Sequence, residues 1–393
     1  MTVPEGLRPR WQAGRAEEIA HALTLLLRAA GYDEEGLRIA CAPYGHLDLP
    51  TAAYPLLASA LEDDLAGWTR AVFYFEQPRP PARDPRAREP MESLEETGVL
   101  HRLQDGRLAS RIKITPFQSM CLAADPVTTH PDGERPQWEG REASVLAVSG
   151  DTRWLSESLP ERPARRLCDL GTGTGVLGLL ASREGSDATT LDLNPRVEAF
   201  VDLNQRLNPG TWVRHLTGDA FAPVAGERFD RIVINPPYVP ALPWETPALS
   251  CTGGPLGDEL LWRLLSEGAQ HLESGGSLYA IGMVARPRGS SLEKLFAERL
   301  PLPERSVDVL LMGSHTPQAF AWHAGEATGA ARNLEALARW ARTTCETGIE
   351  AFDSLLVRLG PGKGPFRQVP DLRPRGLATR LRRAAGAAYR TLR

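Results

Sequence analysis

The sequence lacks the features that would cross-link, anchor or export the chain. Its five cysteines lie far apart and form no C-x-x-C pair, so we expect neither a disulfide framework nor a zinc or other metal site. No uninterrupted apolar run approaches the ~20 residues that a membrane span needs. The first eight residues contain no apolar core of a signal peptide. These absences predict a cytoplasmic protein with reduced thiols.

Lysine is almost absent, and the charge is not strongly basic. Only three of the 45 basic residues are lysine, and the formal net charge is -4. This balance excludes a surface that is basic throughout, although a local basic patch can still bind nucleic acid. The C-terminal tail, residues 366–393, contains eight arginines and one acid, Asp371. We expect this tail either to contact RNA, DNA or a membrane surface or to form a solvated helix.

The length of 393 residues and the pattern of elements indicate two domains. Residues 1–125 predict helices over 15–30, 54–75 and 91–100, followed by a turn at Asp105-Gly106 and a strand over 108–117. Helices followed by a hairpin are typical of a small α+β, winged-helix-like domain. Nucleic-acid contact, substrate recognition and simple packing are all open roles for it. The prolines and glycines of residues 126–142 predict a linker.

The second domain, residues 143–365, alternates strands and helices, which indicates a doubly wound parallel sheet. An insertion over 313–348 precedes the last strand, and residues 366–393 form the tail. We expect seven strands, at 166–170, 189–192, 212–216, 229–234, 277–281, 307–312 and 352–357. Helices are expected between them, at 176–183, 195–207 and 258–272.

A glycine-rich turn follows the first strand of this domain and opens a helix. Asp169-Leu-Gly-Thr-Gly-Thr-Gly175 has the spacing G-x-G-x-G instead of the dinucleotide pattern G-x-G-x-x-G. Glycines here let the backbone approach a ligand closely, and the helix start offers unpaired N–H groups. Asp192 ends the second strand, where a carboxylate can accept both ribose hydroxyl protons. Asp219 follows the third strand.

The segment Asn235-Pro236-Pro237-Tyr238, which we call the clamp, directly follows the fourth strand. An open α/β sheet binds its ligands at this end of its strands. The Asn235 side-chain oxygen and the Pro236 carbonyl can both accept hydrogen bonds from an NH2 group, and the prolines keep them aimed. Tyr238 can stack on a planar substrate. Trp244 is a further candidate for the substrate pocket or for packing of a covering loop.

In this order and about sixty residues apart, the two motifs resemble those of the S-adenosylmethionine-dependent amino-methyltransferases. That superfamily contains the N6-adenine methyltransferases and the glutamine-N5 methyltransferases of peptide-release factors. The resemblance implies a Rossmann-like, seven-stranded class I methyltransferase core with S-adenosylmethionine as cofactor. Asp169 would hold the methionine amino group, Asp192 the ribose and Asp219 the adenine amino group. The cofactor-binding residues would be Asp169, Gly171, Thr172, Gly173, Gly175, Asp192, Leu193, Asp219, Ala220 and Asn235.

We therefore interpret the protein as an N-methyltransferase, with Asn235, Pro236, Pro237 and Tyr238 as catalytic residues. The acceptor would be a planar amide or a heteroaromatic amine in a protein glutamine or a nucleic-acid base. Asn235 in place of an aspartate favours amide, guanine-N2 or release-factor acceptors. The predicted hairpin departs from the helical N-terminal domain of the release-factor enzymes. The alternatives are a natural-product N- or O-methyltransferase and a non-catalytic binding module.

Overall fold

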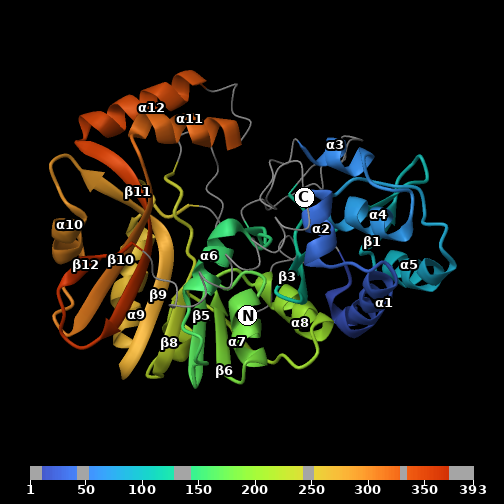
Figure 1. The fold of residues 1–393 in the computed structure, drawn as a ribbon, viewed down its shortest axis with the longest axis horizontal. Helices are drawn as coiled ribbons and strands as arrows, with labels where there is room; N and C mark the ends of the chain where they lie inside the picture. Colours follow the sequence, from blue (N-terminus) through green and yellow to red (C-terminus); the bar gives the residue numbers. More distant parts are fainter. Residues whose placement is uncertain (1–10, 42–52, 128–142, 242–251, 328–333, 371–393) are drawn as a thin grey trace, which may run out of the picture.

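The computed structural model describes residues 11–41, 53–127, 143–241, 252–327 and 334–370. Within these ranges the chain forms an eight-stranded sheet covered by helices and a smaller part of short helices with two β-hairpins (Figure 1). The expected linker falls largely outside the described residues, as do Trp244 and the tail beyond residue 370.

The large sheet is mixed but mostly parallel. Its strands are β5 (Arg166–Leu170), β6 (Asp187–Asp192), β7 (Arg214–Thr217), β8 (Phe229–Ile234), β9 (Leu272–Pro287), β10 (Arg305–His315), β11 (Ile349–Pro361) and β12 (Phe366–Gln368). They lie in the order β12-β10-β11-β9-β8-β5-β6-β7. Only β11 runs antiparallel to its neighbours, β9 and β10, among these paired strands. The chain order reverses between β5 and β8, which marks the ligand-binding position of an open α/β sheet.

All seven strands expected for the second domain are present, so the doubly wound class is confirmed. The count of seven is one too low, because β12 pairs in parallel with β10 at the edge of the sheet. Phe366–Gln368 therefore belongs to the sheet, although the sequence placed these residues in the tail. Arg367 on β12 donates a hydrogen bond of 2.7 Å to the buried carboxylate of Asp308. That charge pairing gives the short edge strand an anchor that no apolar pattern could predict.

Helices cover both faces of the sheet. They are α7 (Val176–Arg183) and α8 (Val197–Leu207) on one face, and α9 (Glu259–Gln270) and α10 (Leu292–Arg299) on the other. Val233 packs into the core under α7 and α8, whereas Ile232 and Ile234 pack into the core under α9 and α10. A strand covered on both faces needs apolar residues at consecutive positions. This requirement explains the unbroken Ile-Val-Ile run that directly precedes the clamp.

The N-terminal part is an α+β module of short elements. Its helices are α1 (Ala16–Ala29), α2 (Glu34–Ala40), α3 (Tyr54–Ser59), α4 (Leu65–Thr69) and α5 (Arg88–Glu96), with a π-helical turn at Arg70–Tyr74. The helix expected over 54–75 is interrupted, because the Asp64 carboxylate accepts a hydrogen bond from the Gly67 backbone N–H and starts a new helix. Local capping thus overrides the longer apolar pattern.

The module contains two hairpins where the sequence predicted one. They pair β1 (Leu100–Arg102) with β2 (Leu108–Ser110), and β3 (Lys113–Phe117) with β4 (Met120–Ala124). The single strand expected over 108–117 is wrong, because the Ser110 hydroxyl bonds to both the backbone N–H and the carbonyl of Ile112 and bends the chain. The second half of that segment then pairs with β4 instead of with β1.

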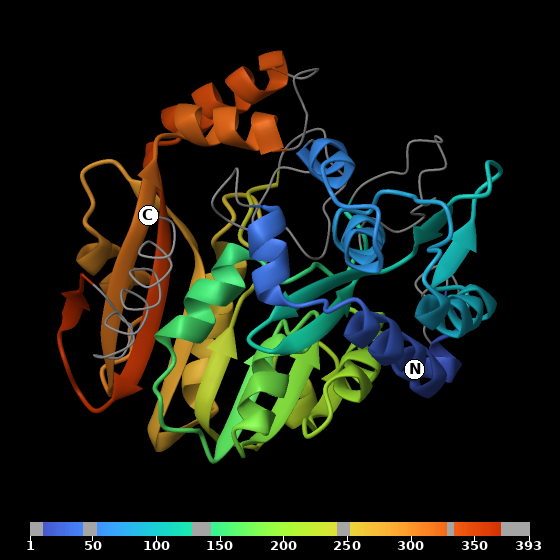
Figure 2. The same ribbon diagram turned by 45° about the vertical axis from the view of Figure 1, so that its right-hand side comes forward.

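The module is docked firmly on α8 (Figure 2). The Asn204 side chain bonds to both the N–H and the carbonyl of Ala123 on β4, and Asn208 does the same for Cys121. Two amide side chains thereby satisfy the edge of β4 as a neighbouring strand would. One continuous apolar core joins the module to the sheet and includes Ile19 and Phe200. The two expected domains therefore share a core.

The segment between β10 and β11 forms a helix pair, α11 (Pro317–Ala327) and α12 (Leu334–Glu346), seen at the upper left of Figure 1. Phe320 and Trp340 pack on Phe352 of β11, with ring centroids 5.0 and 5.7 Å from it. Tyr238 of the clamp packs against the same apolar cluster. The inserted helices are therefore joined through this cluster to the loop that follows β8.

Candidate functional site

The carboxyl ends of β5, β6 and β8 border one cavity of about 360 Å³. The glycine turn, the acid that ends β6, the loop after β7 and the clamp all line it, and α6 (Gly150–Ser158) contributes its first turn. Of the expected cofactor-binding residues, Gly175 alone does not line this cavity. The expected residues that do are Asp169, Gly171, Thr172, Gly173, Asp192, Leu193, Asp219, Ala220, Asn235, Pro236, Pro237 and Tyr238.

The glycine turn after β5 needs glycine for its backbone. Gly171, Gly173 and Gly175 have φ angles of +69°, +53° and +82°, in the left-handed region that side chains disfavour. Gly175 is the residue before the first turn of α7, and a β-carbon there would lie 3.2 Å from Val201. A β-carbon at Gly173 would meet nothing within 4 Å. Gly175 is therefore favoured by its positive φ and by the tight approach of Val201, whereas Gly173 leaves open space for a ligand.

The buried side chain of Asp169 stabilises this turn by hydrogen bonds. Its side chain is 2% exposed, and its Oδ2 accepts hydrogen bonds from the Thr172 hydroxyl at 2.5 Å and from the Gly178 backbone N–H at 3.0 Å. Burial raises the pKa of Asp169 to about 6, although those two hydrogen bonds oppose the rise. One carboxylate oxygen thus holds the strand, the turn and α7 together. Contact with the methionine amino group of a cofactor stays a prediction.

Asp192 links β6 to the glycine turn. Its Oδ2 accepts a hydrogen bond from the Gly173 backbone N–H at 3.0 Å, and its Oδ1 accepts one from Asn194 N–H at 2.9 Å. Burial raises the pKa of Asp192, and the backbone hydrogen bonds lower it. A carboxylate has about four lone-pair sites, so Asp192 keeps acceptor capacity for a ligand hydroxyl. The neighbouring Leu193 is 54% exposed and adds an apolar wall to the cavity.

Asp219 lies in a more open position than the other two acids. Its carboxylate forms an ion pair of 2.8 Å with Arg263 of α9, and more than half of its side chain is exposed. Ala220 is buried and has a φ of +47°, a conformation that is rare for a residue with a β-carbon. Strained backbone of this kind persists where the surroundings impose it, often at ligand sites. Arg263 is a site neighbour that the sequence did not indicate.

The clamp is held by the first turn of α6. The Asn235 amide nitrogen donates a hydrogen bond of 3.2 Å to the Thr152 hydroxyl oxygen. The Tyr238 hydroxyl donates a short hydrogen bond to the Asp151 carboxylate. Pro236 is buried, while Asn235 and Tyr238 remain partly accessible from the cavity. The sequence indicated the position of the clamp but not these two contacts; the serine cap of α6 at Ser149 was the available signal.

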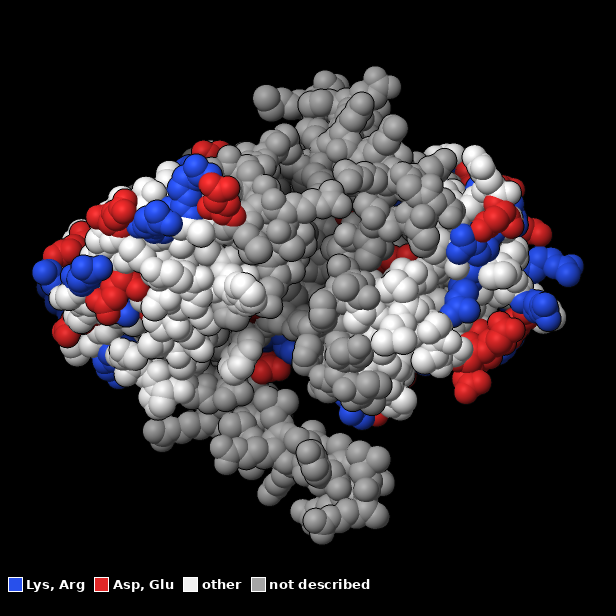
Figure 3. All heavy atoms as spheres, turned by 90° about the horizontal axis from the view of Figure 1, so that it is seen from above, with Lys and Arg blue, Asp and Glu red and all other residues white. Residues whose placement is uncertain are grey.

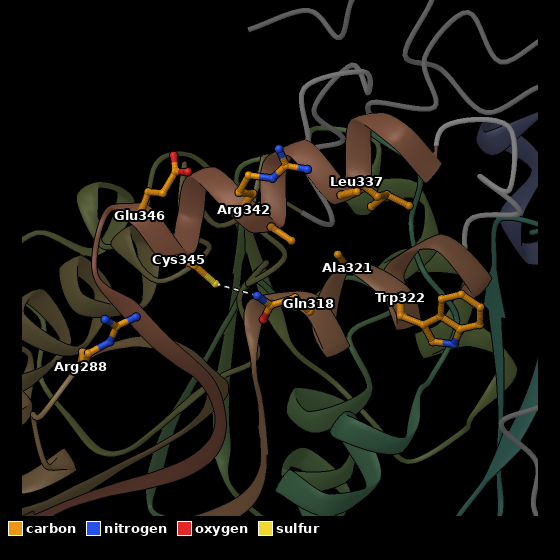
Figure 4. A pocket seen from close by; sticks show the side chains of 10 residues that line it. Arg288, Gln318, Ala321, Trp322, Leu337, Arg342, Cys345 and Glu346 are labelled. Atoms are coloured by element: carbon orange, nitrogen blue, oxygen red, sulfur yellow. Dashed lines mark hydrogen bonds between the residues drawn. The ribbon is translucent and has the colours of Figure 1, made fainter.

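A second, larger cavity of about 710 Å³ lies between α11 and α12 (Figure 4). Trp322 marks one end, and Arg288 marks the other. Gln318 and Cys345 face each other across it, joined by a hydrogen bond of 3.1 Å. No residue of the glycine turn or the clamp lines this cavity. We place the candidate active site in the smaller cavity, because the groups able to bind a cofactor and an amine meet there.

The described ranges contain neither a membrane-spanning helix nor a metal-binding cluster. None of the helices in them combines the length and the apolar character needed to cross a membrane. The same ranges contain no group of three or more His, Cys, Asp or Glu side chains placed to hold a metal ion.

The chain resembles known proteins over its central part. Residues 147–303 match the family model described as "Methyltransferase small domain". A ribosomal RNA large subunit methyltransferase G from Aeromonas salmonicida is 29% identical over 164 residues, covering 40% of this chain and 40% of the relative. The release factor glutamine methyltransferase of Escherichia coli is 34% identical over 145 residues, covering 36% and 47%. The chain thus spans less than half the length of these curated relatives.

Proposed function

We propose that the protein transfers a methyl group from S-adenosylmethionine to a nitrogen atom, since residues 147–303 match the methyltransferase small domain. The acceptor is the NH2 group of a planar amide or a heteroaromatic amine. One observation carries the proposal: the glycine turn, Asp192 and the clamp line a single cavity at the switch point of the sheet. A cofactor bound by the turn would therefore lie beside the two acceptor oxygens of Asn235 and Pro236.

The cavity fits S-adenosylmethionine by the chemistry of its walls. Open space in front of Gly173 admits a ligand close to the backbone, and Asp192 offers two oxygens to the ribose hydroxyls. Leu193 gives an apolar surface to the adenine ring, and Asp219 a carboxylate to its amino group. Asp169, which also lines the cavity, is the acid that we assign to the methionine amino group. When bound, this cofactor supplies a methyl group on a positively charged sulfur.

The chain's own part in the reaction is to position and polarise the acceptor nitrogen. The lone pair of an amide or aromatic amine is delocalised, so the nitrogen is a weak nucleophile. Hydrogen bonds from its NH2 group to Asn235 Oδ1 and to the Pro236 carbonyl favour a more pyramidal nitrogen with a more available lone pair. Both oxygens also stabilise the positive charge that develops on nitrogen. The proton leaves after transfer, so no general base is required.

We favour a macromolecule, either a protein or a nucleic acid, as the methyl acceptor. The relatives named above act on ribosomal RNA and on a release factor by their names, which makes both polymers candidates. On the face seen in Figure 3, basic and acidic side chains lie side by side in the described part, so nucleic-acid binding there would need a local patch. The arginine-rich tail and the winged-helix-like module are the candidates for that contact. Ribosomes and release factors would place the protein in the cytoplasm.

A small-molecule acceptor is the second candidate. The observation that favours it is the apolar cluster in which Tyr238 packs with the inserted helices, because such an insertion can enclose a private pocket. Hydroxyl acceptors belong to this alternative, since they present one proton where the clamp can accept two.

The deciding experiment supplies S-adenosylmethionine with an isotope-labelled methyl group to separated fractions of a bacterial lysate. Protein, RNA, DNA and small molecules are analysed by mass spectrometry after incubation with the wild-type chain or with Asn235→Ala. We expect label on glutamine or on a nucleobase with the wild-type chain alone. Label confined to small molecules would support the second candidate. Cofactor binding without label in any fraction would favour a non-catalytic binding module.

A further inference from the structure

The first turn of α6 contacts both polar ends of the clamp. Thr152 accepts a hydrogen bond from the Asn235 amide nitrogen, and Asp151 accepts one from the Tyr238 hydroxyl. Both α6 residues also line the cavity that borders the clamp. Two successive residues of one helical turn therefore hold two residues of a loop that lies far along the chain.

The contact with Thr152 determines which way the Asn235 amide faces. An asparagine side chain has one donor end and one acceptor end, and only the oxygen can accept a hydrogen bond from a substrate NH2 group. When Thr152 takes the nitrogen, the oxygen is the end left to the cavity. A flipped amide would place its NH2 group opposite another NH2 group, which gives no hydrogen bond.

Thr152 is itself held in the orientation that this role requires. Its side chain is buried, and its backbone N–H donates a hydrogen bond of 3.5 Å to the hydroxyl of Ser149, the N-cap of α6. The two hydroxyl oxygens lie 3.4 Å apart. When Thr152 donates its proton to Ser149, its lone pairs face Asn235. In that arrangement the single hydroxyl proton of Thr152 is used, and Thr152 can only accept a hydrogen bond from the amide.

Tyr238 is fixed from two sides. Its hydroxyl bonds to Asp151, and its ring packs in the cluster that contains Met283 and Phe352. A ring held at both its polar and its apolar parts loses little further conformational freedom when a flat substrate stacks on it.

We propose that Thr152 and Asp151 are positioning residues for the methyl acceptor. Thr152 sets the amide orientation of Asn235, and Asp151 sets the ring of Tyr238. The inference rests on the proposed function, because a clamp for an NH2 group is what the two residues would serve. Neither residue contacts the reacting nitrogen in this scheme.

The test replaces Thr152 by valine, which keeps the shape and removes the hydroxyl. We expect single-turnover methyl transfer about tenfold slower, with cofactor affinity unchanged, because a misoriented amide loses one transition-state hydrogen bond. Thr152→Ser should restore most of the rate. Ser158→Ala is the matched control: among the described residues, this buried hydroxyl on the same helix bonds to the Trp154 carbonyl, at 2.8 Å, and to no residue of the clamp. Thr152→Ala replaces the valine variant if that variant does not fold.

A second readout separates this inference from the proposed function. Side-chain amide NMR signals of Asn235 should show slowed proton exchange in the wild-type chain and faster exchange in Thr152→Val, with Ser158→Ala like wild type. Equal exchange in all variants would overturn the positioning role, whether or not any acceptor is methylated. A Thr152→Val enzyme as fast as wild type would overturn it as well. Wild-type protein that methylates nothing, with Asn235 exchange changed as expected, would contradict the function alone.

The role of Asp151 can be tested independently of Thr152. Asp151→Ala should raise the KM for the acceptor several-fold with a smaller change in kcat, because a free Tyr238 ring must be ordered at each binding event. Asp151→Asn retains an oxygen that can accept from Tyr238 and should behave closer to wild type. Equal acceptor KM values for the alanine variant and wild type would remove Asp151 from the proposal.

Discussion

Arg196 and Asp125 form a buried, two-point ion pair that ties the N-terminal module to the loop after β6. The guanidinium donates hydrogen bonds of 2.6 and 2.8 Å to the two carboxylate oxygens, and the Asp125 side chain is 1% exposed. Asn194 lies between this pair and Asp192: its side chain accepts from the Arg196 N–H, and its own N–H donates to Asp192. The module is thereby connected to an expected cofactor-binding carboxylate.

Removing Arg196 should destabilise the fold through the charge that remains. Arg196→Met leaves the Asp125 carboxylate buried without its partner, which costs about 3–5 kcal/mol of unfolding free energy. The double variant Arg196→Met with Asp125→Asn should recover a large part of the loss, since the amide still accepts from Val145 N–H. Urea unfolding of the three proteins measures these differences. Equal stability of Arg196→Met and wild type would mean that the pair does not hold the module.

Asp192→Ala tests the expected cofactor site. Loss of two ribose hydrogen bonds to a charged group should weaken S-adenosylmethionine binding by about 1.5–3 kcal/mol, roughly ten- to a hundredfold. Isothermal titration calorimetry gives the affinity directly. Asp202→Ala is the control, because this partly exposed acid on α8 pairs with Arg206 one turn away and does not line the cavity. An unchanged affinity in a folded Asp192→Ala protein would place the cofactor elsewhere.

Asn235→Ala should separate binding from chemistry. The acceptor oxygen of Asn235 matters most when the substrate nitrogen gains positive charge, so turnover should fall by about 10²-fold or more. Cofactor affinity should stay close to wild type. Asn235→Asp should be milder, because a carboxylate also accepts the hydrogen bond. Single-turnover rates decide the question. A wild-type rate for Asn235→Ala would mean that the clamp is only a proline-rich loop without a catalytic role.

Asp169 predicts a specific pH dependence of stability in the cofactor-free protein. Its pKa is raised by burial from an ordinary value of 3.8 to about 6, so the folded state binds its proton more tightly than the unfolded state. The contribution of Asp169 to the free energy of unfolding is fully present below pH 3.8 and is lost as the pH rises through about 6. A pKa difference of about two between the folded and unfolded states corresponds to about 3 kcal/mol of unfolding free energy. Relative to wild type, Asp169→Asn should gain stability between pH 4 and pH 7 in urea unfolding, and a constant difference would contradict the burial effect.

The arginine-rich tail can be tested by deletion. Seven of its eight arginines follow residue 370, while Arg367 is engaged by Asp308 in the sheet. If those seven contact nucleic acid, a chain ending at residue 370 should bind RNA or DNA more weakly and with a flatter dependence on salt concentration. Replacing the same arginines by glutamine controls for length. If the intact chain shows no salt-dependent binding to RNA or DNA, the hypothesis that the tail contacts nucleic acid is wrong.

The sequence was sufficient to predict the site residues that lie in local motifs at the ends of successive strands. Motifs that end successive parallel strands must meet at one edge of the sheet, because parallel strands share their direction. The sequence alone therefore assigns Asp192 and Asn235 to one cavity, which both residues line. Gly173 and Gly175 likewise follow from a turn that requires positive φ. The N-terminal module was less predictable, since Ser110 and Asp64 redirect the chain through single side-chain hydrogen bonds.

Tertiary structure alone decided which side chains support that cavity. The sequence determined that an apolar strand ends in Asn-Pro-Pro-Tyr, but Thr152 reaches Asn235 across 83 positions of chain. Arg263 meets Asp219 across 44 positions in the same way. Such contacts leave no periodic trace, because a single hydrogen bond constrains two positions and no repeating pattern. The strands, the turn and the acids were therefore encoded locally, whereas the orientation of the clamp depends on how the sheet, α6 and the inserted helices pack together.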